Sequence, residues 1–132
     1  MEERSKTILV IDDQDDERAI QRAMLSYLGY DVREAETGEA GLRLAIETPP
    51  DLVLLDVAMP RMDGFAVCRA LRADQRTTSV PILLYTASVV GNLREQAQEA
   101  GADGVLTKPI DPRSIAEEVR RIIGPAARRA VP

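Results

Sequence analysis

Five short apolar runs alternate with five helical patterns along the chain, and this alternation constrains its fold most. Most of the runs are continuous stretches of Leu, Ile and Val, which is typical of parallel strands buried on both faces. Parallel strands need helical crossovers, so the order predicts a doubly wound α/β fold with a five-stranded parallel sheet and five helices. The expected strands are 7–11, 31–35, 52–55, 81–85 and 104–107, of which the polar 31–35 suits a sheet edge.

The helical patterns between these runs have recognisable ends. The first helix is expected to begin with Asp15 or Asp16 as its N-cap and to stop at Gly29, and Thr37 is expected to cap the second. Apolar residues of the first helix recur at helical spacing, so we expect these to face the core: Ile20, Ala23, Met24, Tyr27 and Leu28. The last three helices are expected around 65–71, 92–100 and 112–123.

The composition limits what such a domain can do. The chain has 132 residues, no histidine, one cysteine, a net charge of −5 and few aromatic residues. The acidic balance argues against direct nucleic-acid binding, and without histidine the chain cannot form a histidine zinc site or a catalytic triad. No apolar run reaches the length of a signal peptide or membrane span, so we expect a cytoplasmic protein. We expect one domain over 6–123, a lead at 1–5 and a tail or linker at 124–132.

Polar residues follow four of the expected strands directly. Asp12 and Asp13 follow the first strand, Asp56 the third, Thr86 the fourth and Lys108 the fifth. The carboxyl ends of parallel strands form one edge, where ligands bind in such folds, so we expect these five residues to converge. Taken singly, an aspartate at a strand end is usually a turn former or a helix cap, and a lysine is usually solvated. Their shared edge favours a joint site.

A cluster of three carboxylates points to a bound cation, because close carboxylates repel one another unless a cation compensates their charge. A few hard oxygen ligands suit Mg²⁺, which keeps several waters and often binds beside a phosphate. A carboxylate can also attack phosphorus to form an aspartyl phosphate, and a metal, an ammonium and a hydroxyl donor assist that reaction. The residue types at this edge match Mg²⁺-dependent phosphoryl transfer.

Four segments closely resemble the motifs of the response-regulator receiver family of two-component signalling. They are 8–13 (ILVIDD), 51–64 (DLVLLDVAMPRMDG), 81–87 (PILLYTA) and 100–109 (AGADGVLTKP). The resemblance extends over about residues 6–123, and the ordered set is far more specific than any one segment. It implies the flavodoxin-like strand order 2-1-3-4-5 that a chemotaxis receiver has.

The resemblance implies a role for each residue of the shared edge. Asp56 would accept the phosphoryl group. The implied Mg²⁺ ligands are Asp13 directly, Asp12 largely through water, Asp56 itself, and the backbone carbonyl of Ala58. The implied phosphoryl contacts are the Lys108 ammonium, the Thr86 hydroxyl and the Ala87 backbone N–H, with a cis bond between Lys108 and Pro109.

The resemblance also implies how the domain works with partners. The donor would be a phosphohistidine on a sensor histidine kinase or a histidine phosphotransfer protein. The receiver would be no enzyme beyond catalysing its own phosphorylation and dephosphorylation. The added charge would rearrange the face made by the fourth helix, the fifth strand and the fifth helix. The domain would act by docking to a downstream protein or through an output domain, without itself contacting nucleic acid or a membrane.

Two positions depart from the usual family pattern. Many receivers have Tyr or Phe three residues before the site lysine, where this chain has Val105, so the usual aromatic coupling is not expected. Tyr85 is a second candidate for part of that role, but a packed core ring is the favoured interpretation. Ala58 and Ser88 occupy positions whose side chains help to set the hydrolysis rate in the family. The Ala58 methyl group orients no water, so we expect unremarkable or slow self-hydrolysis.

Three other functions fit the sequence less well. A haloacid-dehalogenase-type phosphatase also uses an aspartate nucleophile and Mg²⁺, but it needs a second aspartate where this chain has Ala58. A nucleotide- or flavin-binding domain is disfavoured because neither glycine-rich phosphate loop is present. A pseudo-receiver, which serves only as an interaction scaffold, usually loses one of the five site residues, and all five are present here.

Overall fold

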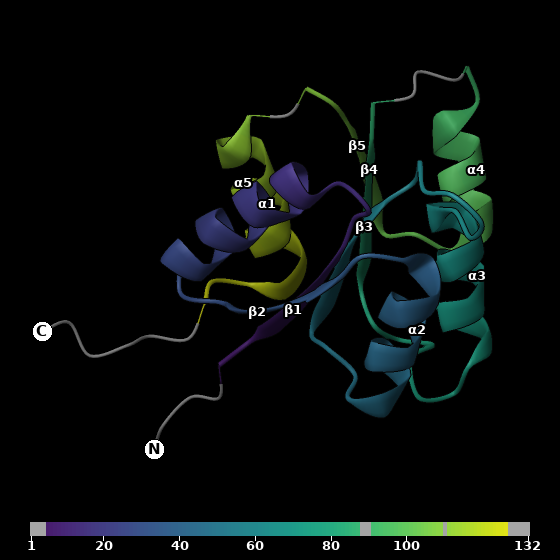
Figure 1. Ribbon diagram of the computed structural model, residues 1–132, viewed down its shortest axis with the longest axis horizontal. Helices are drawn as coiled ribbons and strands as arrows, with labels where there is room; N and C mark the ends of the chain where they lie inside the picture. The colour runs from purple at the N-terminus through teal and green to yellow at the C-terminus, as the bar shows by residue number, and fades with distance from the viewer. Residues whose placement is uncertain (1–4, 88–90, 110, 127–132) are drawn as a thin grey trace, which may run out of the picture.

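A five-stranded parallel sheet forms the middle of the molecule, with helices on both of its faces (Figure 1). The computed structural model describes residues 5–87, 91–109 and 111–126. The strands are β1 (Thr7–Ile11), β2 (Asp31–Ala35), β3 (Leu52–Asp56), β4 (Ile82–Thr86) and β5 (Gly104–Thr107). The helices are α1 (Asp15–Tyr27), α2 (Gly38–Glu47), α3 (Gly64–Ala73), α4 (Leu93–Ala100) and α5 (Pro112–Ile123).

The strand order is β2-β1-β3-β4-β5, which confirms the predicted doubly wound topology. Figure 1 shows α1 and α5 on one face of the sheet and α2, α3 and α4 on the other. A largely aliphatic cluster fills the space under each layer, and the strands β3 and β4 are buried along their whole length. The polar strand β2 lies at an edge and is partly exposed, as its composition predicted.

Several of the predicted element ends are confirmed. The Thr37 side chain accepts a hydrogen bond from the Ala40 N–H (3.0 Å) and caps α2. Gly29 follows the C-cap of α1 with a φ of +100°, a conformation that glycine adopts without strain. Strand β4 begins at Ile82 rather than at Pro81, whose carbonyl nevertheless accepts a hydrogen bond from Val53.

The predictions for α1 were wrong in two respects. Its N-cap is Gln14, so Asp15 and Asp16 lie inside the first turn, where their charges favour the helix N-terminus. The predicted apolar face is turned largely outward, with Ile20 57% and Tyr27 89% exposed, whereas the buried residues are Gln21 and Leu25.

Arg18 gives a physical reason for this rotation of α1. Its guanidinium reaches back under the helix and donates a hydrogen bond to the backbone carbonyl of Asp12 (2.8 Å). Positions 18, 21 and 25 share one side of a helix, and Ile20 and Tyr27 then lie on the opposite side.

Both described ends of the domain lie close together. The Lys6 ammonium donates to the carbonyls of Ile123 (2.6 Å) and Pro125 (2.9 Å), and the Tyr30 hydroxyl donates to the carbonyl of Gly124 (2.9 Å). The first residues after α5 therefore contact the domain, and the division into lead, domain and tail stays a prediction. Within the described ranges, no helix is both long and apolar enough to cross a membrane.

Candidate functional site

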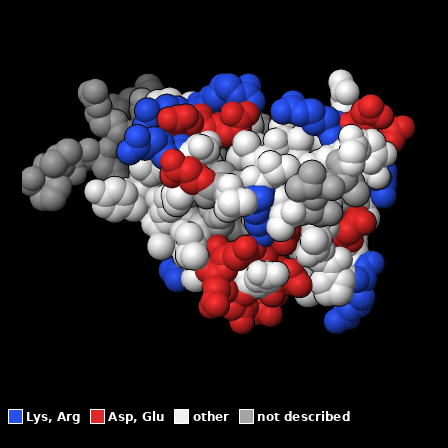
Figure 2. Space-filling model, turned by 90° about the horizontal axis from the view of Figure 1, so that it is seen from above, with Lys and Arg blue, Asp and Glu red and all other residues white. Residues whose placement is uncertain are grey.

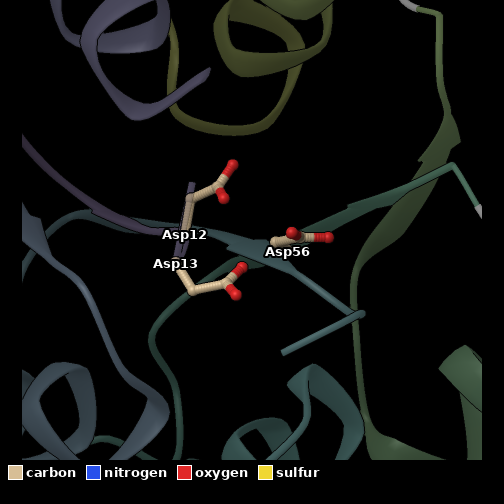
Figure 3. A group of neighbouring side chains, drawn as sticks. All are labelled: Asp12, Asp13 and Asp56. Atoms are coloured by element: carbon tan, nitrogen blue, oxygen red, sulfur yellow. The ribbon is translucent and has the colours of Figure 1, made fainter. Parts of the chain in front are cut away.

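Three carboxylates meet at the carboxyl ends of the central strands (Figure 3). Asp12 and Asp13 follow β1 and Asp56 ends β3, and the pairing of Ile11 with Leu55 brings the two strand ends level. One oxygen atom from each carboxylate lies within 4.8 Å of the others. Asp12 and Asp56 are buried, whereas Asp13 is exposed. The cluster is thus open to solvent on the side of Asp13.

The surface around this cluster is acidic. Figure 2 looks onto the carboxyl ends of the strands and shows acidic side chains gathered into one patch there. The exposed residues Asp13, Asp15 and Asp16 all belong to this end of the fold. Such a patch favours the approach of a cation.

Burial leaves the two inner carboxylates poorly stabilised as anions. Burial, together with the charge of Asp12, raises the pKa of Asp56 from 3.8 to about 6, although Lys108 and the hydrogen bond from the Ala58 N–H lower it. Burial also raises the pKa of Asp12, against the hydrogen bonds from the Tyr85 hydroxyl and the Gln14 N–H, which lower it. A cation placed among these oxygens would remove most of this cost.

Lys108 directly follows β5. In the strand order of the sheet, Asp56 on β3 therefore lies between Asp13, which follows β1, and Lys108. Its ammonium is 3.8 Å from Oδ2 of Asp56, and it also forms an ion pair with Glu17 of α1. The Lys108 N–H donates to the carbonyl of Thr86 (2.7 Å), which ties the two strand ends together. The peptide bond between Lys108 and Pro109 is cis, as the resemblance implied.

The remaining predicted residues border the same place. Thr86 is the buried last residue of β4, and Ala87 follows it and is exposed. The Ala58 N–H donates to Oδ1 of Asp56 (3.2 Å), and Ala58 itself is exposed. The structure therefore gathers the predicted carboxylates and ammonium at one edge, and Thr86 ends the strand next to Asp56, while Ser88 lies outside the described residues.

Gly64 keeps the loop after β3 close to the site. A Cβ atom on this residue would lie 2.5 Å from the carbonyl oxygen of Asp56 and 2.7 Å from the Cα of Val57. Only a glycine allows the start of α3 to approach the backbone of the site so closely.

Two residues that contact the site were not predicted from the sequence, namely Tyr85 and Glu17. The Tyr85 hydroxyl donates a hydrogen bond to the Asp12 carboxylate, although its ring is buried in the core as predicted. Glu17 pairs with Lys108, which was expected to face only the phosphoryl group. Strand alternation contained a signal for Tyr85, because it places Tyr85 on the same face of the sheet as Val10 and Leu106, two residues before Asp12 and Lys108.

Known proteins are similar to this chain in sequence and in fold. The family model of the response regulator receiver domain matches residues 8–120. The DNA-binding dual master transcriptional regulator RpaA of Synechocystis is 40% identical over 118 residues, which are 88% of this chain and 48% of that protein. The chain spans about half the length, or less, of the curated relatives it matches.

Solved structures agree with the family match. A putative response regulator from Chloroflexus aurantiacus has a TM-score of 0.86 at 32% identity, covering 91% of this chain and 98% of that one. The receiver domain of a sensor histidine kinase from Pseudomonas aeruginosa, with a magnesium ion coordinated in its active site cleft, has a TM-score of 0.84 at 30% identity. The match there covers 92% of this chain and 99% of that one. With the motifs, the strand order and the acidic edge in agreement, this chain belongs to the response regulator receiver domain family of two-component signalling.

Proposed function

We propose that the domain accepts a phosphoryl group on Asp56 with the help of Mg²⁺. The observation that supports this most directly is the meeting of three carboxylates with the Lys108 ammonium at one edge of the sheet. Asp56 is the member that lies between the other carboxylates and the ammonium, within 3.8 Å of Lys108. It is therefore the nucleophile best placed for an incoming phosphoryl group.

The residues present fit a magnesium ion. All the donors are hard oxygens, and the three carboxylate oxygens lie close enough to surround one ion while leaving room for water and a phosphate. Asp13 would bind the ion directly, Asp12 largely through water, and Asp56 and the carbonyl of Ala58 would complete the protein ligands. When bound, Mg²⁺ would neutralise charge that develops on the transferred phosphoryl oxygens.

The protein groups define the transfer step. An Asp56 carboxylate oxygen forms a bond to phosphorus while the bond from phosphorus to the donor's imidazole nitrogen breaks. The electron pair stays on that nitrogen, and the imidazole takes up one proton from solvent. Lys108, the Thr86 hydroxyl and the Ala87 N–H hold the phosphoryl oxygens in place.

Phosphorylation would switch the domain by adding about −1.5 to −2 charges at one buried point. The new oxygens would attract Thr86 and Lys108, which end β4 and follow β5. The face made by α4, β5 and α5 would then rearrange. Val105 is half-buried against the core under α2, α3 and α4, so this switch would work without an aromatic ring at that position.

The proposed partners follow from this chemistry. The chain has no histidine, so a phosphohistidine donor must belong to another protein. That donor is a sensor histidine kinase or a histidine phosphotransfer protein in the cytoplasm. The signal passes to a downstream protein or to an output domain. The greater length of the curated relatives, one of them a DNA-binding regulator, supports an output domain.

Acetyl phosphate tests the function directly. Incubation with acetyl phosphate and Mg²⁺ should add one phosphoryl group to the wild type, by intact mass, and none to Asp56→Asn. Asp63→Asn is the matched control, because Asp63 is an exposed aspartate in the loop after β3 and an asparagine there still caps α3. Equal labelling of Asp56→Asn would refute the acceptor, and a wild type that gains no phosphoryl group would favour a pseudo-receiver scaffold.

A magnesium titration tests the ligand set separately. Asp13→Ala should weaken Mg²⁺ binding strongly, because it removes the exposed carboxylate of the cluster. An unchanged affinity would refute the assignment of Asp13 as a ligand.

A further inference from the structure

Tyr85 touches both halves of the site from inside the core. Its hydroxyl donates a hydrogen bond to Oδ2 of Asp12, and the Lys108 ammonium lies 4.7 Å from the centroid of its ring. The side chain is fully buried. One residue thus contacts a member of the three-carboxylate cluster and the Lys108 ammonium that faces Asp56.

The hydroxyl completes the hydrogen bonding of a buried carboxylate. Oδ1 of Asp12 accepts from the Gln14 N–H (2.9 Å), and Oδ2 accepts from Tyr85. Each oxygen is therefore held by one donor, which fixes the plane of the carboxylate while leaving lone pairs for a metal-bound water. A tyrosine hydroxyl carries its proton at neutral pH, so Tyr85 is the donor in this pair and the Asp12 carboxylate is the acceptor.

The ring supports the lysine from the other side. Glu17 and Asp56 contact the ammonium of Lys108 through oxygens, and the aromatic face of Tyr85 lies under it. An ammonium at this distance is attracted by the ring, and the flat surface limits where the long side chain can go. A core ring without a polar role would need no hydroxyl, because a buried phenol is costly unless its oxygen has a partner.

We propose that Tyr85 is a positioning residue of the phosphorylation site, fixing Asp12 through its hydroxyl and Lys108 through its ring. The inference rests on the proposed function. It separates into two effects, because phenylalanine removes only the hydroxyl and leucine removes the ring as well.

The first test is the magnesium affinity, measured by NMR chemical-shift titration of the backbone amides. Tyr85→Phe should weaken Mg²⁺ binding about tenfold, the lower end of the loss seen when a hydrogen bond to a metal ligand is removed. The matched control is Tyr30→Phe, which removes a buried tyrosine hydroxyl from the same apolar cluster, far from the site, where it donates to the Gly124 carbonyl. That control should leave the affinity unchanged.

A double-mutant cycle shows whether the effect passes through Asp12. In an Asp12→Ala background, Tyr85→Phe should change the Mg²⁺ affinity less than twofold. An affinity of Tyr85→Phe within twofold of the wild type, or an equal loss in both backgrounds, would overturn the role of the hydroxyl.

The second test follows the lysine. The side-chain methylene protons next to the Lys108 ammonium should show an upfield ring-current shift in the wild type and in Tyr85→Phe, and should lose it in Tyr85→Leu. At equal Mg²⁺ occupancy, Asp56 of Tyr85→Leu should gain a phosphoryl group from acetyl phosphate about two- to fivefold more slowly than Asp56 of Tyr85→Phe. Equal rates would overturn the role of the ring.

The same experiments separate this inference from the proposed function. A wild type that binds no Mg²⁺ or gains no phosphoryl group on Asp56 would refute the proposed function and the inference together. A wild type that does both, with variants that behave identically, would refute the inference alone.

Discussion

Replacing Asp56 by asparagine is expected to stabilise the metal-free domain at neutral pH. Asp56 is 2% exposed, and burial raises its pKa from 3.8 to about 6. At about 1.4 kcal/mol per pKa unit, this difference corresponds to about 3 kcal/mol of stability that the ionised carboxylate removes from the folded state. Asparagine resembles the protonated carboxyl group, and its oxygen can still accept from the Ala58 N–H.

The sign of the pH dependence follows from the direction of this shift. Between pH 3.8 and about 6 the folded state binds more protons at Asp56 than the unfolded chain, so the stability of the wild type falls as pH rises. Above about pH 6 the full destabilisation is present, and below 3.8 it is absent. The advantage of Asp56→Asn should therefore be about 3 kcal/mol at pH 7.5 and should vanish near pH 3.5.

Urea unfolding in EDTA at a series of pH values measures this difference. Asp16→Asn is the matched control, because Asp16 is exposed in the first turn of α1, where its charge favours the helix end. That variant should be slightly less stable than the wild type, by about 0.3–1 kcal/mol at low ionic strength. An Asp56→Asn variant that is no more stable at pH 7.5, or whose advantage does not change with pH, would refute the reasoning.

Three further outcomes are expected at and around the site. Glu17→Gln should speed phosphorylation by acetyl phosphate about two- to fivefold, because a half-exposed ion pair worth about 0.5–1 kcal/mol no longer holds Lys108; an equal or slower rate would contradict this. Gly64→Ala should lower the free energy of unfolding by about 1–3 kcal/mol in thermal or urea melts, because its Cβ would meet backbone atoms at 2.5 and 2.7 Å; a neutral result would show that the loop moves aside freely. The phosphorylated domain should outlast a time of seconds at neutral pH, by intact mass after removal of acetyl phosphate, because the exposed Ala58 methyl orients no water; decay within seconds would count against this.

Much of the site could be predicted from local sequence patterns. The apolar runs predicted where each strand ends, and in a parallel sheet all those ends lie at one edge. The positions of Asp12, Asp56 and Lys108 therefore followed from strand boundaries alone, within one residue. The identity of their roles still depends on the family resemblance and on the experiments above.

The side chains that contact these residues could not be predicted in the same way. Tyr85 reaches Asp12 across 73 residues, and Lys108 reaches Glu17 across 91. Each contact depends on how far a side chain extends past the end of its strand and on where α1 sits above the sheet. Strand alternation predicts the face of the sheet on which Tyr85 lies, but periodicity along the chain contains neither of these quantities.

The orientation of α1 shows most clearly which features the sequence predicts and which depend on the tertiary structure. Repeating patterns of 2 and 3.6 residues were sufficient for the number, type and order of the elements, because hydrogen bonding and burial act on those periods locally. The side of α1 that faces inward is the one with Leu25 in the core and with Arg18 donating to the Asp12 carbonyl. Those contacts arise only when the helix packs on the sheet, so the outward position of Ile20 and Tyr27 is a property of the assembled domain.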